Sequence, residues 1–133
     1  MEKQHRHSKK REAIRGLLAG TREHPSAEWI YTRLKPDFPD LSLGTVYRNL
    51  HLFREEGEIL CVGTVAGQDR FDFDTSPHAH FICEHCGRVI DVDTPENGAA
   101  LLPASLPGEP RSFALNFFGC CRTCLKIRED ESP

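Results

Sequence analysis

The sequence has no internal repeat, no low-complexity tract and, at its beginning, no uninterrupted apolar stretch. Its first 18 residues, MEKQHRHSKKREAIRGLL, are charged and predict neither a signal peptide nor a membrane span. The chain also lacks an overall excess of positive charge, since its formal net charge is −3. We therefore expect a cytoplasmic protein with no membrane partner, in a compartment that keeps thiols reduced.

The length and composition predict a small globular protein whose fold needs additional stabilisation. With 133 residues, of which 38% are hydrophobic, the chain can form one ordinary domain or two very small ones. Small cores usually need disulfides, a structural metal or a subunit interface. The chain has six cysteines, and in a reducing compartment paired Cys-x-x-Cys units indicate metal ligands more than disulfides.

The net charge conceals a gradient along the chain. Residues 1–54 carry 11 Lys/Arg and 6 Asp/Glu, whereas residues 55–133 carry 6 Lys/Arg and 14 Asp/Glu. The basic half can face phosphates while the acidic half binds cations. The alternative is two solvated surfaces of different composition.

Three helices are predicted first, and the third has a polar face. Their predicted N-caps are Ser8, Ser26 and Ser42, and they end at Gly20, before Pro36 and at Gly57. Apolar residues recur at helical spacing, namely Ala13, Ile14, Leu17 and Leu18, then Ala27, Ile30 and Leu34, then Leu43, Val46, Leu50 and Phe53. The polar face of the third helix presents Gly44, Thr45, Arg48 and His51.

After Gly57 the pattern changes to β-strands. Residues 58–62 and 69–73 predict a hairpin with a turn at 63–67, which completes a winged helix-turn-helix over residues 1–74. Residues 75–133 form a second, β-rich region with strands at 78–83, 88–92 and 111–118 and a short helix near 96–102. The predicted fold class is α+β.

Two Cys-x-x-Cys units, separated by 34 residues, predict a zinc site. The ligands are Cys83, Cys86, Cys121 and Cys124, and four thiolates complete a tetrahedral Zn(II) shell with no open position. This zinc is therefore expected to be structural. Disulfides are the alternative, and Cys120 can in principle replace Cys121. Cys61 and Cys120 are expected to be small buried residues without an assigned role.

A second group has nitrogen and oxygen ligands. His78 and His80 are two residues apart in an extended segment, so both side chains share one face. If Cys83 lies opposite Arg88 in a hairpin, His80 lies opposite Asp91. Asp72 shortly precedes this strand, so the four residues can converge on Fe, Mn, Zn or Ni. Singly, each is more typical of a surface or hydrogen-bonded residue.

Five segments resemble the ferric uptake regulator (Fur) family, most closely its peroxide-responsive PerR branch. They are HPSAEWIY at 24–31, LGTVYRNL at 43–50, RFDF at 70–73, HAHFICEHCG at 78–87 and CRTC at 121–124. The resemblance covers about residues 6–126. It implies an N-terminal winged helix that binds DNA, a C-terminal α/β dimerisation domain, the four-cysteine zinc and a regulatory metal between the domains.

The resemblance also implies roles for individual residues. The regulatory Fe(II) or Mn(II) would be held by His24, Asp72, His78, His80 and Asp91, and peroxide would act by oxidising His24 or His78. A homodimer would place the third helix of each subunit in the major groove of palindromic double-stranded DNA. From the Ser42 cap and the polar face of the third helix, we predict that Arg48 reads a base and that Thr45 and Tyr47 contact phosphates. Lys9, Lys10, Arg11 and Arg15 would add backbone attraction.

The chain departs from many family members in three places. It lacks an extra leading helix, the segment RSFALNFF at 111–118 has no ligands for a further metal, and prolines between 103 and 110 shorten the dimerisation helix. Asp91 matches the peroxide branch, whereas iron-uptake regulators more often have glutamate there. A repressor that senses hydrogen peroxide is thus the leading hypothesis.

Three other functions remain alternatives. The first is a metal-uptake regulator of the same family that responds to iron, zinc or manganese. The second is a zinc hydrolase or deaminase, which is disfavoured because four thiolates leave the zinc no open position. The third is a scaffold protein with a merely structural zinc. The protein is therefore not expected to be an enzyme.

Overall fold

The computed structural model describes residues 2–95, 102–111 and 113–131. The chain divides into two compact units, Met1–Thr75 and Ser76–Pro133, and the division lies one residue after the predicted boundary at Asp74. Among the described residues, no helix has a stretch long and apolar enough to cross a membrane. Each unit is described below by itself.

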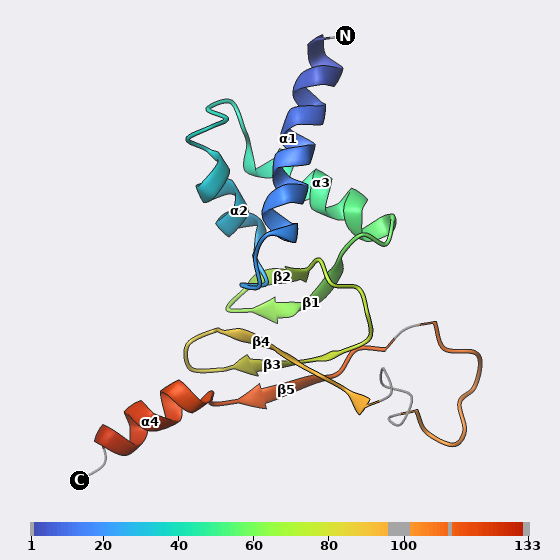
Figure 1. The fold of residues 1–133 in the computed structure, drawn as a ribbon, viewed down its shortest axis with the longest axis vertical. Helices are drawn as coiled ribbons and strands as arrows, with labels where there is room; N and C mark the ends of the chain where they lie inside the picture. Colours follow the sequence, from blue (N-terminus) through green and yellow to red (C-terminus); the bar gives the residue numbers. More distant parts are fainter. Residues whose placement is uncertain (1, 96–101, 112, 132–133) are drawn as a thin grey trace. The chain divides into compact units, whose positions relative to one another are not determined.

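The first unit begins with three helices, α1 (Glu2–Ala19), α2 (Ala27–Leu34) and α3 (Leu43–Glu55) (Figure 1). The predicted caps of α2 and α3 are confirmed, because Ser26 Oγ accepts from the Trp29 amide and Ser42 Oγ from the Thr45 amide, both at 3.1 Å. The prediction that Ser8 caps α1 is wrong, since the helix begins at Glu2. The residues before Ser8 include Glu, Lys, Gln and Arg, whose good helix propensity favours an earlier start.

The hairpin of the first unit has a tighter turn than the sequence indicated. Strand β1 (Leu60–Val65) pairs antiparallel with β2 (Gln68–Asp72), so the strands extend into the predicted 63–67 turn. The turn consists of Ala66 and Gly67, with φ values of 52° and 80°. Two successive left-handed residues are typical of the two-residue turn that matches the natural twist of a hairpin. The winged helix is therefore complete.

The core of this unit is built from the predicted apolar positions. Ile14, Leu18, Ile30, Val46 and Phe53 are all at most 1% exposed, and Leu50 lies in the same cluster. Phe71 of β2 packs against it, so the hairpin is attached to the helices by apolar contacts. Burial of large apolar side chains is the main favourable term in folding. The buried apolar side chains of α3 therefore fix this helix against the rest of the unit.

The second unit contains a three-stranded sheet followed by a helix. Strands β3 (Ala79–Cys83), β4 (Val89–Val92) and β5 (Asn116–Gly119) lie in the order β4-β3-β5, with β3 antiparallel to β4 and parallel to β5. The predicted register is confirmed, because His80 pairs with Asp91 and Phe81 with Ile90.

Two features of the second unit differ from the prediction or lie outside it. Helix α4 (Arg122–Glu131) was not predicted, and it makes the second Cys-x-x-Cys the start of a helix. The Leu125 amide donates to the Cys121 carbonyl at 2.8 Å, as in a first helical turn. The strand predicted at 111–118 is shorter and begins at Asn116. The short helix predicted near 96–102 lies outside the described residues, except for Leu102.

Candidate metal centres and nucleic-acid interface

The four predicted zinc ligands lie together in the second unit. Cys83 ends β3, Cys86 follows it in the turn to β4, and Cys121 and Cys124 lie at the start of α4. All four Sγ atoms lie within 4.8 Å of one another. The Cys83–Cys124 separation is 3.8 Å and the Cys86–Cys121 separation is 3.9 Å. We call these residues the four-cysteine group.

The sulfur separations match a tetrahedral metal shell. Four thiolates with Zn–S bonds of about 2.3 Å have sulfur atoms about 3.8 Å apart along the edges of the tetrahedron. A disulfide needs sulfur atoms about 2.05 Å apart, and all six cysteines are free. The group therefore suits zinc in size and in donor chemistry, and its four ligands leave no position for a substrate.

The backbone prepares one of these thiols for ligation. The amides of Cys121 and Cys86 donate to Cys83 Sγ at 3.3 and 3.4 Å, and these hydrogen bonds lower the pKa of Cys83 to about 5. Burial raises the pKa of Cys124. The hydrogen bonds therefore favour the thiolate form of Cys83, whereas the raised pKa of Cys124 means that a metal must displace its proton.

The two remaining cysteines lie outside this group. Cys120 is partly buried and packs against it, but the member of the group is Cys121. Cys61 lies on β1 in the first unit, where it packs against the core and burial raises its pKa. A raised pKa reduces the thiolate fraction and hence the reactivity of Cys61.

In the first unit, His24 and Asp72 form a buried nitrogen–oxygen pair. His24 Nε2 lies 3.3 Å from Asp72 Oδ2, and the residues are 3% and 8% exposed. His24 has a φ of 53°, an uncommon conformation for a residue other than glycine. Arg70 holds this backbone, since its guanidinium donates to the carbonyls of His24 and Glu23. The Phe71 amide also donates to the Pro25 carbonyl at 3.0 Å, which places Asp72 beside the loop.

In the second unit, His78, His80 and Asp91 form a second nitrogen–oxygen cluster. Asp91 Oδ1 lies 3.1 Å from His78 Nε2 and 3.4 Å from His80 Nε2, and the two imidazole rings are 4.5 Å apart. His78 Nδ1 lies 2.7 Å from the Ser76 carbonyl, which can only accept a hydrogen bond. With its proton on Nδ1, His78 would donate to this carbonyl and offer the Nε2 lone pair to a metal shared with Asp91, the arrangement found in metal-ligating histidines.

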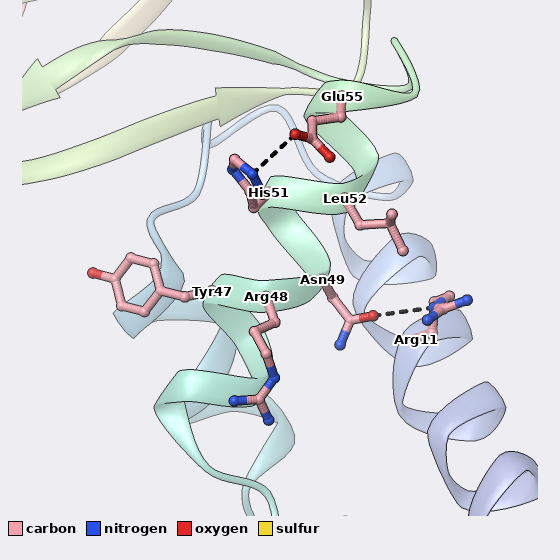
Figure 2. A pocket seen from close by; sticks show the side chains of 7 residues that line it. All are labelled: Arg11, Tyr47, Arg48, Asn49, His51, Leu52 and Glu55. Carbon is pink, nitrogen blue, oxygen red and sulfur yellow. Dashed lines mark hydrogen bonds and ion pairs between the residues drawn. The ribbon is translucent and has the colours of Figure 1, made fainter.

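The polar surface of α3 forms a groove of about 540 Å³ in the first unit. It is lined by Arg11, Tyr47, Arg48, Asn49, His51, Leu52 and Glu55. Figure 2 shows Asn49 reaching toward Arg11 of α1, while Tyr47 projects from the opposite side of α3. Arg48 is exposed and donates to Thr45 Oγ1 at 3.0 Å, so its guanidinium lies along the first turns of the helix.

Thr45 and Tyr47 are both engaged within the protein. Thr45, predicted on the exposed face, is buried at 8% exposure, with its hydroxyl 2.9 Å from that of Ser42. Its position in the first turn, between the Ser42 cap and Arg48, explains the burial. Tyr47 is 43% exposed, and its hydroxyl donates to Glu28 Oε1 at 2.6 Å.

The basic residues predicted to attract the DNA backbone also differ among themselves. Lys9 is exposed, whereas Lys10 lies 3.1 Å from Asp40 and Arg15 is paired with Glu58. Arg11 Nε donates to Asn49 Oδ1 at 3.1 Å. Paired cations contribute less to a positive surface than free ones, so these four residues are not equivalent.

Two residues of this surface were missed from the sequence. Asn49 is 5% exposed and links α1 to α3, because it accepts from Arg11 and donates to the Thr45 carbonyl at 2.9 Å. Glu28 of α2 was missed because nothing in the local pattern indicates its contact with Tyr47. Asn49 was missed because a polar residue four positions after Thr45 is equally typical of an exposed helix face.

Comparisons with known proteins agree with this architecture. The model of the ferric uptake regulator family matches residues 2–100. The peroxide-responsive repressor PerR of Staphylococcus aureus (strain USA300) is 34% identical over 116 residues, which cover 86% of this chain and 78% of that protein.

Two solved structures extend the similarity to the fold. The Helicobacter pylori ferric uptake regulator Fur superimposes with a TM-score of 0.77 at 28% identity, over 93% of this chain and 83% of that chain. The Pseudomonas aeruginosa ferric uptake regulator with manganese gives a TM-score of 0.69 at 26% identity, over 85% and 87%. The predicted α+β fold, a winged helix followed by a C-terminal dimerisation domain, is confirmed. The chain belongs to the ferric uptake regulator family, whose members are transcriptional regulators and not enzymes.

Proposed function

We propose that this protein is a metal-dependent, homodimeric DNA-binding repressor that senses hydrogen peroxide in the cytoplasm. The observation that carries the proposal is the division of its nitrogen and oxygen ligands between the units. The His24–Asp72 pair lies in the first unit, and the His78–His80–Asp91 cluster lies in the second. Neither set is a complete metal shell, and both differ in chemistry from the four-cysteine group.

The four-cysteine group is proposed to hold structural Zn(II). Its sulfur separations of 3.8 and 3.9 Å and its lack of non-sulfur donors support this assignment. Since Cys83 ends β3, while Cys121 directly precedes α4 and Cys124 lies in its first turn, the zinc would connect the sheet to the C-terminal helix. Structural zinc contributes directly to the free energy of folding, which suits a unit in which few of the described residues are buried and apolar.

A regulatory Fe(II) or Mn(II) is proposed to bind His24, Asp72, His78, His80 and Asp91 together. Imidazole and carboxylate donors suit these ions, whereas thiolates favour softer ones. The ion would select the arrangement of the two units in which all five side chains reach it. It can shift that equilibrium only by the difference in its affinity for the two arrangements.

In that arrangement the dimer is proposed to present both copies of α3 to palindromic double-stranded DNA. The exposed Arg48 would read a base edge in the major groove, and Lys9 would contact the phosphate backbone. Two-fold symmetry of the dimer requires two half-sites related by the same symmetry. Without the regulatory metal, the DNA-binding arrangement of the two units would no longer be favoured, and the dimer would release the DNA.

Peroxide sensing would depend on which metal is bound. If these side chains held Fe(II), it would supply the chemistry that reduces hydrogen peroxide beside its ligands, whereas Mn(II) would supply far less of it. The net reaction inserts one oxygen atom from hydrogen peroxide into an imidazole ring of His24 or His78 and releases water. An oxidised imidazole is a different donor, so metal affinity falls and repression ends.

The second candidate is a metal-uptake regulator of the same family, without peroxide sensing. The similarity of the chain to the two ferric uptake regulators, at 28% and 26% identity, favours it. Both candidates require metal-dependent DNA binding and differ only in their response to peroxide.

The decisive first experiment is a mobility-shift assay with anaerobically purified, zinc-containing protein. We expect the protein to bind operator DNA with Mn(II) or Fe(II) and to release it when the regulatory metal is removed. Treatment with peroxide should then release the DNA from the Fe(II) form alone. Equal binding with and without a regulatory metal excludes both candidates, and equal resistance of both metal forms to peroxide favours the uptake regulator.

A further inference from the structure

The hydroxyl of Tyr47 on α3 is bound to the carboxylate of Glu28 on α2. Tyr47 donates to Glu28 Oε1 at 2.6 Å, while 43% of the tyrosine remains exposed. The other carboxylate oxygen, Oε2, is buried, and no partner among the described residues reaches it. The hydrogen bond from Tyr47 thus offsets part of the free energy that Glu28 loses when its carboxylate is removed from water.

This contact fixes the direction of hydrogen bonding at the tip of Tyr47. A phenol has one proton, and here that proton points at Glu28, because a carboxylate can only accept. The exposed side of the phenol oxygen therefore offers lone pairs alone. Phosphate oxygens are acceptors as well, so Tyr47 can donate to a phosphate only after it leaves Glu28.

The major groove does contain donors that suit such an oxygen. Adenine presents its N6 amino group there and cytosine its N4 amino group, whereas guanine and thymine present only acceptors, apart from the thymine methyl group. A tyrosine held as an acceptor therefore distinguishes A and C from G and T at the base it faces. A tyrosine with a free proton makes no such distinction.

We infer that Glu28 is a specificity-determining residue, which holds Tyr47 as a hydrogen-bond acceptor for an adenine or cytosine amino group. The inference rests on the proposed entry of α3 into the major groove. It revises the expectation that Tyr47 contacts a phosphate. Glu28 acts through Tyr47 and need not touch the DNA, which makes it a positioning residue.

Two further features support this role. Glu28 lies in the first turn of α2, where the positive end of the helix dipole favours a carboxylate. The hydrogen bond to Glu28, together with burial and the charges of Glu28 and Asp69, raises the pKa of Tyr47. The phenol therefore keeps its proton, and that proton stays on the Glu28 side.

The test measures base preference with the full-length, Mn(II)-loaded dimer. Wild-type protein and variants compete for a panel of operators in which each base pair of a half-site is replaced in turn. The variants are Glu28→Ala, Tyr47→Phe and the double variant, with Glu28→Met as a second substitution that keeps the side-chain length. Asp37→Ala removes an exposed negative charge from the same unit and is the matched control.

We expect the wild type to prefer A or C at one position of each half-site. Glu28→Ala and Glu28→Met should reduce that preference by roughly 2- to 12-fold, the range for a single net hydrogen bond. The double variant should match Tyr47→Phe, and Asp37→Ala should keep the wild-type preference while it raises affinity for all operators alike.

Two results overturn the inference. In one, the Glu28 variants keep the wild-type preference. In the other, Glu28→Ala changes the base preference by the same factor in the wild type and in the Tyr47→Phe variant. Glu28 would then act independently of the Tyr47 hydroxyl. A wild-type protein that binds no operator with any regulatory metal instead refutes the proposed function, and the wild type alone shows this.

Discussion

Arg15 holds Glu58 through two hydrogen bonds, from Nε to Oε2 at 2.9 Å and from Nη2 to Oε1 at 3.2 Å. The same guanidinium lies 4.8 Å from the centre of the Phe53 ring and also contacts Glu12. Arg15 thus links α1 to the segment between α3 and β1, and it covers Phe53 of the core. A bidentate pair of this kind has better geometry than most surface ion pairs, although both side chains remain about one third exposed.

Arg15→Ala is therefore expected to lower stability more than DNA affinity. The melting temperature should fall by a few degrees, because an ion pair and a cation–π contact are lost together. The dependence of DNA affinity on salt should stay the same, because the pairing of Arg15 with Glu58 leads us to expect no phosphate contact. Lys9→Ala is the contrasting variant, and a salt slope reduced by Arg15→Ala as much as by Lys9→Ala contradicts this assignment.

The Arg15–Glu58 pair also predicts a pH dependence of stability. The hydrogen bond from Arg15 lowers the pKa of Glu58 below its ordinary value of 4.5. A carboxylate with a lowered pKa stabilises the folded state above the unfolded-state pKa and loses this effect as pH falls through the folded-state pKa. The stability difference between wild type and Glu58→Gln should be largest at neutral pH and shrink below about pH 4.5. Thermal melts from pH 7 to pH 3 measure it.

Arg48→Ala is expected to relax base specificity at a single position of each half-site. Arg48 is exposed, and its guanidinium donates to Thr45 Oγ1 within the same helix, a contact that it can exchange for one to a base. Loss of one bidentate base contact should cost roughly 1–3 kcal/mol of binding free energy. Lys9→Ala should instead weaken binding to all sequences alike. Unchanged affinity and preference after Arg48→Ala would remove Arg48 from base reading.

Substitution of the four-cysteine group is expected to remove zinc and destabilise the second unit. Cys83→Ser and Cys121→Ser should each lose one equivalent of zinc, as measured by elemental analysis, and melt at a lower temperature. Cys61→Ser and Cys120→Ser are matched controls that should retain it, because neither sulfur belongs to the group. One equivalent of zinc retained in both Cys83→Ser and Cys121→Ser would refute the assignment.

The elements that were predicted correctly have local signals. Helix α3 follows from a cap and an apolar repeat of three and four residues, both within the helix itself. The β3–β4 register follows from the Cys83-to-Gly87 turn, which brings adjacent segments together. Gly87 has a φ of 77°, a conformation that glycine adopts without strain.

The contacts that were missed join residues far apart in the sequence. Strand β5 pairs with β3 across more than thirty residues, and no pattern within either strand indicates that partner. The conformation of His24 depends on Arg70, which is 46 positions away. Before the structure, only the family resemblance connected His24 with a metal site. The pairing of Arg15 with Glu58 and of Tyr47 with Glu28 was hidden for the same reason.

The peroxide response gives the last prediction, and it depends on the bound metal. Fe(II)-loaded and Mn(II)-loaded protein are treated with modest hydrogen peroxide, digested and mapped by peptide mass spectrometry. We expect one added oxygen atom on a peptide containing His24 or His78 in the Fe(II) sample only, in parallel with loss of DNA binding. His51 is an internal control, because it is 72% exposed at its side chain and lies on α3, outside both nitrogen–oxygen sets.

The rival route for this response is oxidation of a thiol. Thiolates react with peroxide, and Cys83 has a pKa of about 5, but coordination to Zn(II) in a full shell should slow the reaction. Cys61, with its raised pKa and partial burial, should react slowly as well. If DNA binding is lost while all histidines stay intact, the sensor is a thiol. If the Fe(II) and Mn(II) forms respond alike, iron chemistry is excluded. Oxygen on His51 as abundant as on His24 or His78 would indicate diffuse damage, because an oxidant formed at the proposed site should attack its own ligands first.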